Sequence, residues 1–422
     1  MMTRILSTAA IAFFATSFHV DIAKADSIGW PGFLGPHRDG VSSETGLLKK
    51  WPKSGPRELW KIDVGDGFGG AAIVGDNVYI LDRADIDQEI LRCLDFASGK
   101  QKWQHAYSTM KVKLPHAGSR STPQVDGDFI YTYGRVGNLV CVNRQTHQEV
   151  WSHDLMKDYG LESTARWGYS ASPLVVGDIV IVPALDNEGG HLIGFNKRSG
   201  KVAWERKDIG GAHYVTPRLY EIHGVQQVLT FGRLSGEEGQ FTSVDPKTGK
   251  VLWKFNGYFN KIMIPMPTNM GDGRLFVTGG YGAGSVMIQV SKKGGSYSVK
   301  ELYRIEGEGS QLHQAHLHEG HLYVNWNTNE NLKKNKKAGG LVCIDPDNGK
   351  VLWRTGEKPN FERGPLLFAD GMIIILDGEL GELALVDPSP GGYHELARAK
   401  VFTKLKKKGN KIWSAMALTD GK

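Results

Sequence analysis

Cysteine is scarce in this chain, with 3 residues among 422. So few cysteines exclude a fold that depends on a dense disulfide framework. Charge of one sign is not in large excess either, because 51 Lys and Arg face 45 Asp and Glu, a formal net charge of +6. With 40% hydrophobic and 23% charged residues, the composition also excludes a disordered chain, a collagen and a coiled coil.

The amino terminus has the pattern of a secretory signal peptide. Arg4 provides a positive start, residues 5–18 are uncharged and mostly apolar, and residues 23–25 (Ala-Lys-Ala) offer a cleavage site. We therefore expect removal of residues 1–25 and a mature protein that is periplasmic or secreted. A retained membrane anchor is the alternative, but no later segment approaches the roughly 18 apolar residues of a membrane helix. No cysteine adjoins the cleavage site, so a lipid anchor is not expected.

The three cysteines share one local context. Cys93, Cys141 and Cys343 each follow two residues of an apolar strand pattern. We expect three buried free thiols that pack as small hydrophobic groups. A disulfide between Cys93 and Cys141 is disfavoured, because equivalent positions in successive repeats should lie too far apart.

Glycine and tryptophan are abundant, and they mark a repeat. A small residue is followed by Asp, Ser, Gly, Lys and Trp at fixed spacing over residues 93–103. Further copies occupy residues 194–204, 243–253 and 343–353, a decayed copy at 141–151 has His147 and Gln148 in place of Gly-Lys, and a looser copy ends at Tyr303. The closing aromatic residues lie 48 to 53 residues apart.

Each copy has the chemistry of a β-hairpin. Asp accepts hydrogen bonds from backbone amides two residues on, and Gly adopts the positive φ that ends the turn. Apolar alternation on both sides predicts the two strands, and the Trp on the second strand can cover a neighbouring sheet.

A second turn motif keeps the same spacing and sets the number of units. Strands that end in Gly-Asp or Asp-Gly turns recur at positions 71, 123, 173, 217, 267, 316, 367 and 417. Eight units of about fifty residues, each with room for four short strands, predict an all-β, eight-bladed β-propeller of four-stranded antiparallel blades. The alternative is a long β-sandwich array.

The two chain ends should meet in the last blade. No repeat precedes Trp60, so we expect it on the outer strand of that blade, beside a first strand near residue 417. The chain stops in the turn after this strand, at 420–422, so the blade should be incomplete, through truncation or imperfect ring closure. The expected organisation is an N-terminal segment at 26–57 and a propeller at 58–422.

These motifs resemble those of a known family. The Asp-x-x-Thr/Ser-Gly-Lys-x-x-Trp copies look like the tryptophan-docking motifs of the PQQ-like (quinoprotein-like) repeat propellers, across residues 58–422. Residues 30–41 and 55–60 resemble the start of exported members. The resemblance implies docking roles for Trp60, Trp103, Trp151, Trp204, Trp253, Tyr303 and Trp353.

The family allows two functions, and this sequence departs from both. It includes quinone-dependent alcohol dehydrogenases, which usually carry adjacent cysteines and a calcium site of oxygen ligands. No two cysteines here are adjacent, and no cluster of Asp, Glu and Asn is evident on the inner strands. PQQ with calcium is therefore disfavoured, and no cofactor is expected. The family also includes the propeller lipoprotein of outer-membrane β-barrel assembly, whose anchoring cysteine is absent here.

Special residues gather in one set of predicted loops. In a four-stranded blade, the D–A loops (from the outermost strand to the next innermost strand) and the B–C loops share one face, and here they are the longer ones. We expect a ligand or partner site at the channel mouth on this long-loop face. The candidate residues are His116, Arg120, Arg166, Trp167, His213, Tyr214, His313, Arg363 and Trp413.

Other motifs give weaker indications of a functional site. Strand alternation places His316 and His318 on one face and His313 on the other, and His321 follows a turn. The four histidines therefore do not converge, and no metal site is expected. The Gly-rich stretch 280–284 lies between strands and lacks the following helix that a phosphate loop needs. No Gly-x-Ser-x-Gly motif occurs, and no catalytic residue is assigned.

Two lysine runs should lie on the long-loop face. They comprise Lys333, Lys334, Lys336 and Lys337, and Lys404, Lys406, Lys407, Lys408 and Lys411. They are interpreted as solvated loops, with a patch for an acidic glycan, lipid headgroup or protein as the alternative.

The sequence thus favours an exported, monomeric, non-enzymatic binding or scaffold propeller that acts through its long-loop face. Its expected partner is an unidentified protein or glycan outside the cytoplasm, and nucleic acid is not expected. The alternative is a PQQ-dependent alcohol or sugar dehydrogenase-like oxidoreductase. A carbohydrate-active or glycan-binding propeller is a third hypothesis, suggested by the aromatic and basic loops.

Overall fold

The computed structural model describes residues 29–116, 118–161, 164, 166–185, 189–212, 214–405 and 409–422. Residues 1–25, the predicted signal peptide, lie outside these ranges. In the described ranges, no helix is long and apolar enough to cross a membrane.

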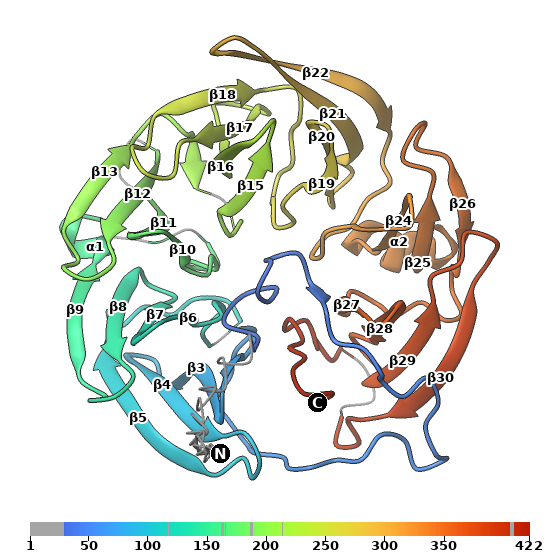
Figure 1. Cartoon of the computed structure of the whole chain (residues 1–422), viewed down its shortest axis with the longest axis horizontal. Coiled ribbons are helices and arrows are strands. Elements are labelled where there is room, and N and C mark those ends of the chain that lie inside the picture. The colour runs from blue at the N-terminus through green and yellow to red at the C-terminus, as the bar shows by residue number, and fades with distance from the viewer. Residues whose placement is uncertain are drawn as a thin grey trace, which may run out of the picture.

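The described residues form an all-β ring of seven sheets (Figure 1). Each sheet is an antiparallel meander whose first strand lies nearest the centre and whose fourth strand lies outermost. The strands are short and the turns tight, as the hairpin motifs predict. One sheet gains an additional parallel strand from the N-terminal segment.

The strands follow one another around the ring. The first three sheets contain β2 (Ala72–Val74), β3 (Asn77–Asp85), β4 (Gln88–Asp95) and β5 (Gln101–Ser108); β6 (Gln124–Asp126), β7 (Phe129–Tyr133), β8 (Asn138–Asn143) and β9 (Glu149–Asp154); and β10 (Leu174–Val176), β11 (Ile179–Leu185), β12 (Gly190–Asn196) and β13 (Val202–Arg206). The fourth contains β15 (Arg218–Ile222), β16 (Val225–Arg233), β17 (Gly239–Val244) and β18 (Val251–Phe255), with β14 (Gly211–Ala212) also paired to β16.

The last three sheets complete the set. They contain β19 (Thr268–Gly271), β20 (Arg274–Gly279), β21 (Gly284–Lys293) and β22 (Ser296–Ile305); β23 (His316–His318), β24 (His321–Asn325), β25 (Leu341–Ile344) and β26 (Val351–Arg354); and β27 (Leu366–Ala369), β28 (Met372–Leu376), β29 (Glu382–Asp387) and β30 (His394–Lys400). The short helices are α1 (Leu155–Asp158), α2 (Asn329–Lys334) and the 3-10 turn η1 (Lys336–Ala338).

The predicted hairpin turns are confirmed. Asp95 Oδ1 accepts from the Ser98 amide at 2.9 Å, and the Gly99 amide donates to Asp95 O at 2.8 Å. Gly99 has a φ of +68°, a backbone conformation that glycine adopts without strain. The decayed copy keeps this geometry with His147 at a φ of +61°.

The docking aromatics join each sheet to the turn of the next one. In five of the seven predicted positions, the ring N–H or O–H donates to a backbone carbonyl of the next Asp/Asn turn. These bonds are Trp60 to Phe96 O, Trp151 to Lys197 O, Trp204 to Pro246 O, Tyr303 to Pro346 O and Trp353 to Ser389 O, at 2.8 to 3.1 Å.

The two departures have local causes. Trp103 faces the decayed turn, and its ring stacks on His147 at 4.5 Å between centroids. Trp253 precedes the long β21–β22 hairpin, which lacks the Asp-to-Gly turn, and its Nε1 donates instead to Gln227 Oε1 within its own sheet at 2.6 Å.

The three cysteines are free and buried, as predicted. Each lies directly across the strand pair from a docking Trp, with Cys93 opposite Trp103. A small side chain at this position leaves room for the indole ring, because the partner positions on neighbouring strands are in contact.

The N-terminal segment crosses the ring instead of adding a repeat (Figure 1). Trp30 exchanges two backbone bonds with Ile73 of the first sheet, and Pro31 O accepts from the Val125 amide of the second, all at 2.7 Å. The segment then reaches the last sheet, where β1 (Val41–Ser42) pairs in parallel with β27. It therefore closes the centre of the ring at the level of the inner strands.

No eighth four-stranded sheet forms among the described residues. The two segments assigned to it nevertheless meet, because Trp60 and Ile62 pack in one apolar cluster with Met416, Ala417 and Leu418. They lie between the first and last sheets, so the chain ends are brought together as expected, without paired strands.

Candidate functional site

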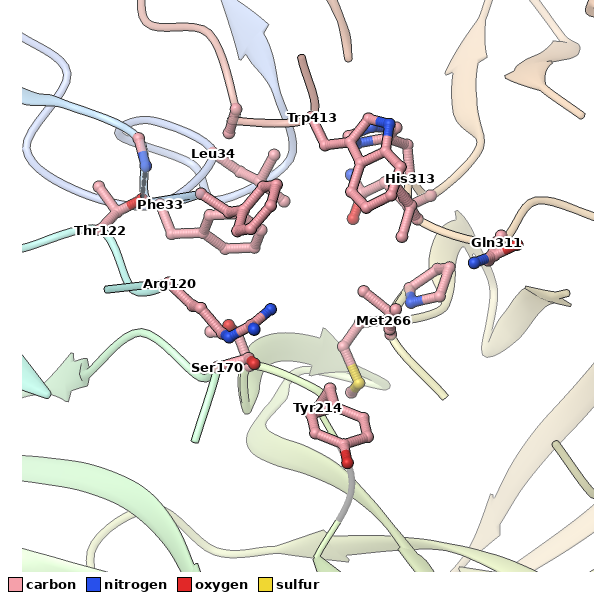
Figure 2. A pocket seen from close by; sticks show the side chains of 18 of the residues that line it. Phe33, Leu34, Arg120, Thr122, Ser170, Tyr214, Met266, Gln311, His313 and Trp413 are labelled. Atoms are coloured by element: carbon pink, nitrogen blue, oxygen red, sulfur yellow. Dashed lines mark hydrogen bonds between the residues drawn. The ribbon is translucent and has the colours of Figure 1, made fainter. Parts of the chain in front are cut away.

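A cavity of about 350 Å³ lies at the centre of the ring, on the long-loop face. D–A loops that lead into all seven sheets line it, together with residues 411–415 from the C-terminal segment. Figure 2 shows Phe33, Arg120, Tyr214, Met266 and Trp413 around its open centre. We call this space the channel cavity.

Seven of the nine residues predicted for the long-loop face line the channel cavity. They are His116, Arg120, Trp167, Tyr214, His313, Arg363 and Trp413. Arg166 does not line it and lies over the Trp167 ring at 5.1 Å. His213 lies outside the described residues.

The floor of the cavity comes from the N-terminal segment, which sequence reasoning did not place there. Phe33, Leu34 and Arg38 line the cavity from this segment. Arg38 Nη2 donates to Val175 O at 2.7 Å, and Gln314 Nε2 donates to Asp39 O at 2.8 Å. The sequence signal in this stretch was its resemblance to the start of exported family members, and that gives no location.

An aromatic wall forms around Trp413. Its ring stacks on Phe68 at 5.6 Å between centroids, and the Arg363 guanidinium lies over it at 4.5 Å. Trp413 Nε1 donates to Glu362 Oε2 at 2.9 Å, and Glu362 also forms an ion pair with Arg363 at 2.6 Å. This network fixes the indole face beside the cavity.

Arg120 supplies positive charge from another wall. Its Nη2 donates to the carbonyls of Pro115 and His116 at 3.1 and 2.9 Å, and its guanidinium lies 5.4 Å from the Phe68 ring centroid. Burial, assisted by repulsion from Arg135, lowers the pKa of Arg120 to about 10. The group remains charged at neutral pH.

Two more guanidinium groups lie at the floor. Arg218, 8% exposed at the start of β15, donates to Gln314 Oε1 and stacks over Tyr220 at 5.2 Å. Burial lowers the pKa of Arg38, attraction by Asp126 offsets part of this effect, and repulsion by Arg218 adds to it. Sequence reasoning missed Arg218 because inner-strand residues were not included among the candidates.

Two cavity histidines, His313 and His316, are neutral near pH 7. Burial lowers the pKa of His313 to about 4, and its Nε2 donates to Arg363 O at 3.0 Å. Burial and repulsion by Arg218 lower the pKa of His316 to about 3. No group of three metal-ligating His, Cys, Asp or Glu side chains occurs in the described part of the chain.

Of the described residues of the two lysine runs, Lys411 lines the channel cavity, and the first run follows a cavity residue, Asn329. Asn329, the first residue of α2, lines the cavity and accepts from Arg363 Nη1 at 2.5 Å, and Lys333 and Lys334 end the same helix. Lys411 lines the cavity, and its Nζ lies 3.2 Å from His116 Nδ1. Lys406, Lys407 and Lys408 lie outside the described residues.

The charged side chains described in the cavity lining are all basic. Arg38, Arg120, Arg218, Arg363 and Lys411 line the channel cavity, whereas no described Asp, Glu or Cys does so. Carboxylate-assisted acid–base catalysis or attack by a thiol has no described residue in this lining to perform it. The arrangement is suited to holding a negatively charged molecule.

Comparisons with known proteins identify the class. Residues 87–261 match a repeat-family model described as outer membrane protein assembly factor BamB. The dehydrogenase subunit of a quinone alcohol dehydrogenase from Gluconobacter oxydans is 23% identical over 269 residues, 57% of this chain and 32% of that protein. BamB from Shewanella oneidensis is 21% identical over 224 residues, 53% of this chain and 52% of that protein.

Solved structures agree on the fold. A europium-containing methanol dehydrogenase aligns with a TM-score of 0.63 at 14% identity, over 92% of this chain and 86% of that one. BamB from Moraxella catarrhalis aligns with a TM-score of 0.51 at 15% identity, over 78% and 87%. The chain is a propeller with PQQ-like repeats, related to quinoprotein alcohol dehydrogenases and to BamB. It spans about a third of the quinone dehydrogenase and about half of BamB.

The described lining does not fit PQQ held beside calcium. Calcium needs six to eight oxygen ligands, mostly carboxylates and carbonyls. The described residues that line the cavity contribute no carboxylate, and Glu362 accepts from Trp413 and forms an ion pair with Arg363. The three cysteines are buried in separate sheets, so no pair of them meets at the cavity.

Proposed function

We propose that this chain is an exported, eight-bladed PQQ-like propeller that acts as a non-enzymatic binding protein through its long-loop face. One observation carries the proposal. The channel cavity is lined by loops from every sheet and closed below by the chain's own N-terminal segment, and its described lining has cations and aromatic rings but no carboxylate or thiol. Pockets of this size and depth are the usual sites of small ligands.

The eighth blade of the proposed ring is the pair of segments around Trp60 and 411–422. The Trp60 indole docks on the first sheet as the other docking rings do, at 2.8 Å from Phe96 O. Residues 411–415 line the cavity as the other D–A loops do. Export and a monomeric state complete the proposal. N-terminal sequencing of protein from the exported fraction, and its mass in solution, test them.

A cavity-filling variant tests the binding function. Ser170 lines the cavity, so Ser170→Trp should fill it, whereas Ser298→Trp places the same ring on the exposed outer strand β22. Small neutral and charged molecules, including sugars, are screened by thermal shift and calorimetry. The proposal expects a ligand that binds the unmodified chain and the Ser298→Trp variant but not Ser170→Trp. A ligand that is indifferent to Ser170→Trp would contradict it.

A quinone-dependent alcohol or sugar dehydrogenase is the second candidate, favoured by the names of the relatives. Its test is titration with PQQ and calcium, followed by dye reduction with alcohols and sugars. Calcium-dependent binding with substrate-dependent dye reduction would replace the binding proposal. If either calcium-dependent PQQ binding or substrate-dependent dye reduction is absent, the dehydrogenase hypothesis is wrong.

A further inference from the structure

At the floor of the channel cavity, one glutamine bonds to the Arg218 guanidinium and to the backbone beside Arg38. Gln314 Nε2 donates to Asp39 O at 2.8 Å, next to Arg38, and Gln314 Oε1 accepts from Arg218. Arg38 comes from the N-terminal segment and Arg218 from β15, so the fold brings two like charges together across 180 residues of sequence. Repulsion by Arg218 contributes to the lowered pKa of Arg38, so the two charges are close enough to disfavour each other.

Neither floor arginine has a carboxylate partner among the described residues. Arg218 and Arg38 form no described ion pair, and Asp126, which attracts Arg38, pairs with Lys197 at 2.7 Å. Arg218 is only 8% exposed, and its Nε–H is buried without a hydrogen-bond partner. A buried donor without a partner is rare in native proteins and costs stability.

Arg120 repeats this situation on the cavity wall. It has no described ion pair, its Nε–H is buried without a partner, and its described hydrogen bonds go to two backbone carbonyls. Arg120 lies over Phe68, whereas Arg218 lies over Tyr220, so the two charges belong to separate parts of the lining. The cavity therefore offers two positions for negative charge.

We propose that the channel cavity binds an organic oxyanion with two or more negative charges, without a metal ion. One anionic group would lie against Arg38 and Arg218 at the floor and a second against Arg120 on the wall. Guanidinium groups bind carboxylate, sulfate and phosphate through paired N–H donors, which would also satisfy the orphaned Nε–H groups.

The rest of the cavity indicates the body of such a ligand. The stacked pair of Trp413 and Phe68 supplies aromatic surface, and Met266 supplies an adaptable apolar contact from another part of the lining (Figure 2). A volume of about 350 Å³ admits one ring-sized molecule. The inference rests on the proposed binding function and names its ligand class.

A charge series tests the inference by calorimetry. The probes are isophthalate, benzoate and benzamide, which share one ring and carry two, one and no carboxylates. Glucose 1-phosphate and glucose form the phosphorylated arm. Isophthalate or glucose 1-phosphate should bind, at least about tenfold tighter than benzoate or glucose respectively, since each charge-assisted bond contributes about a factor of ten or more. Binding of isophthalate would identify carboxylate as the preferred anionic group, and binding of glucose 1-phosphate would identify phosphate.

Matched variants locate the site. Arg218→Gln and Arg120→Gln should each weaken binding of the dianion by about tenfold or more. Arg274→Gln removes an arginine at the A–B turn of β20, where it pairs with Asp347 at 2.9 Å, and should leave binding unchanged. Near-ultraviolet circular dichroism confirms that each variant is folded. If Arg218→Gln does not fold, Arg120→Gln alone decides.

The outcomes separate this inference from the proposed function. Dianion binding that survives both arginine variants, or failure of both dianions to bind at millimolar concentration, overturns the anion inference. Benzamide or glucose that binds as tightly as its charged counterpart, and is lost in Ser170→Trp, also overturns it while the binding function stands.

Discussion

Trp204 provides a test of how neighbouring blades are held together. Its indole is 8% exposed and lies between two glycines, one in its own sheet and one in the next turn. A Cβ built on Gly194 would lie 2.4 Å from the ring, and one on Gly249 would lie 2.6 Å from it. Nε1 donates to Pro246 O at 3.1 Å. The ring thus packs so closely on both glycines that neither position has room for a side chain.

The expected cost of Trp204→Ala follows from this burial. A buried Trp removes roughly 200 Å² from water, and at about 25 cal/mol per Å² this amounts to about 5 kcal/mol as an upper limit. Measured truncations of buried aromatic residues cost about 3–5 kcal/mol, and the lost hydrogen bond adds about 1 kcal/mol. We expect a loss of about 4 kcal/mol for Trp204→Ala and about 1–2 kcal/mol for Trp204→Phe, which keeps most of the ring.

Trp103 offers a matched control at the equivalent repeat position. Its ring is partly exposed and stacks on His147, with no described hydrogen bond to the next turn. Trp103→Ala should therefore cost clearly less than Trp204→Ala. The assay is urea unfolding followed by near- and far-ultraviolet circular dichroism, with agreement between the two signals required. Equal costs for the two substitutions would refute the view that docking on the Asp-to-Gly turn stabilises the ring.

Three further outcomes can be measured on the same protein. Gly249→Ala should cost more than Gly177→Ala in urea unfolding, because both have a positive φ but only Gly249 faces a ring, whereas the Cβ at Gly177 would meet open space. Burial lowers the pKa of His313 to about 4, below its unfolded value of about 6.5, so between these values the unfolded chain binds the proton more readily. The contribution of neutral His313 to the free energy of unfolding should therefore be complete above about pH 6.5 and decrease towards pH 4. In thermal melts, His313→Gln should flatten this pH dependence. Burial raises the pKa of all three cysteine thiols, so a thiol reagent should label the protein slowly until denaturant is added, and fast labelling of the native chain would contradict their burial.

Most of the fold could be predicted from the sequence repeat. Local chemistry sets each hairpin, because the Asp side chain and the Gly φ act within five residues, and this is visible without tertiary information. The exceptions were also encoded locally, in His147 and in the missing turn after Trp253. Within the described ranges the eighth blade has no paired strands, because strand pairing there depends on how the two chain ends meet.

The site was less visible in the sequence. The position of the D–A loops follows from blade topology, so residues such as Arg120 and Trp413 could be placed at the channel mouth. Arg38 could not, because the N-terminal segment reaches the cavity through backbone bonds to distant sheets that no repeat predicts. Arg218 begins an inner strand, where sequence patterns indicate packing rather than ligand contact.

The most direct test of the account is a pair of calorimetric titrations of the full chain, one with isophthalate and one with PQQ plus calcium. The account predicts saturable isophthalate binding that is about tenfold or more weaker in Arg218→Gln, and no requirement for calcium. Stoichiometric PQQ binding that depends on calcium and persists in Arg218→Gln, together with no isophthalate binding, would contradict it.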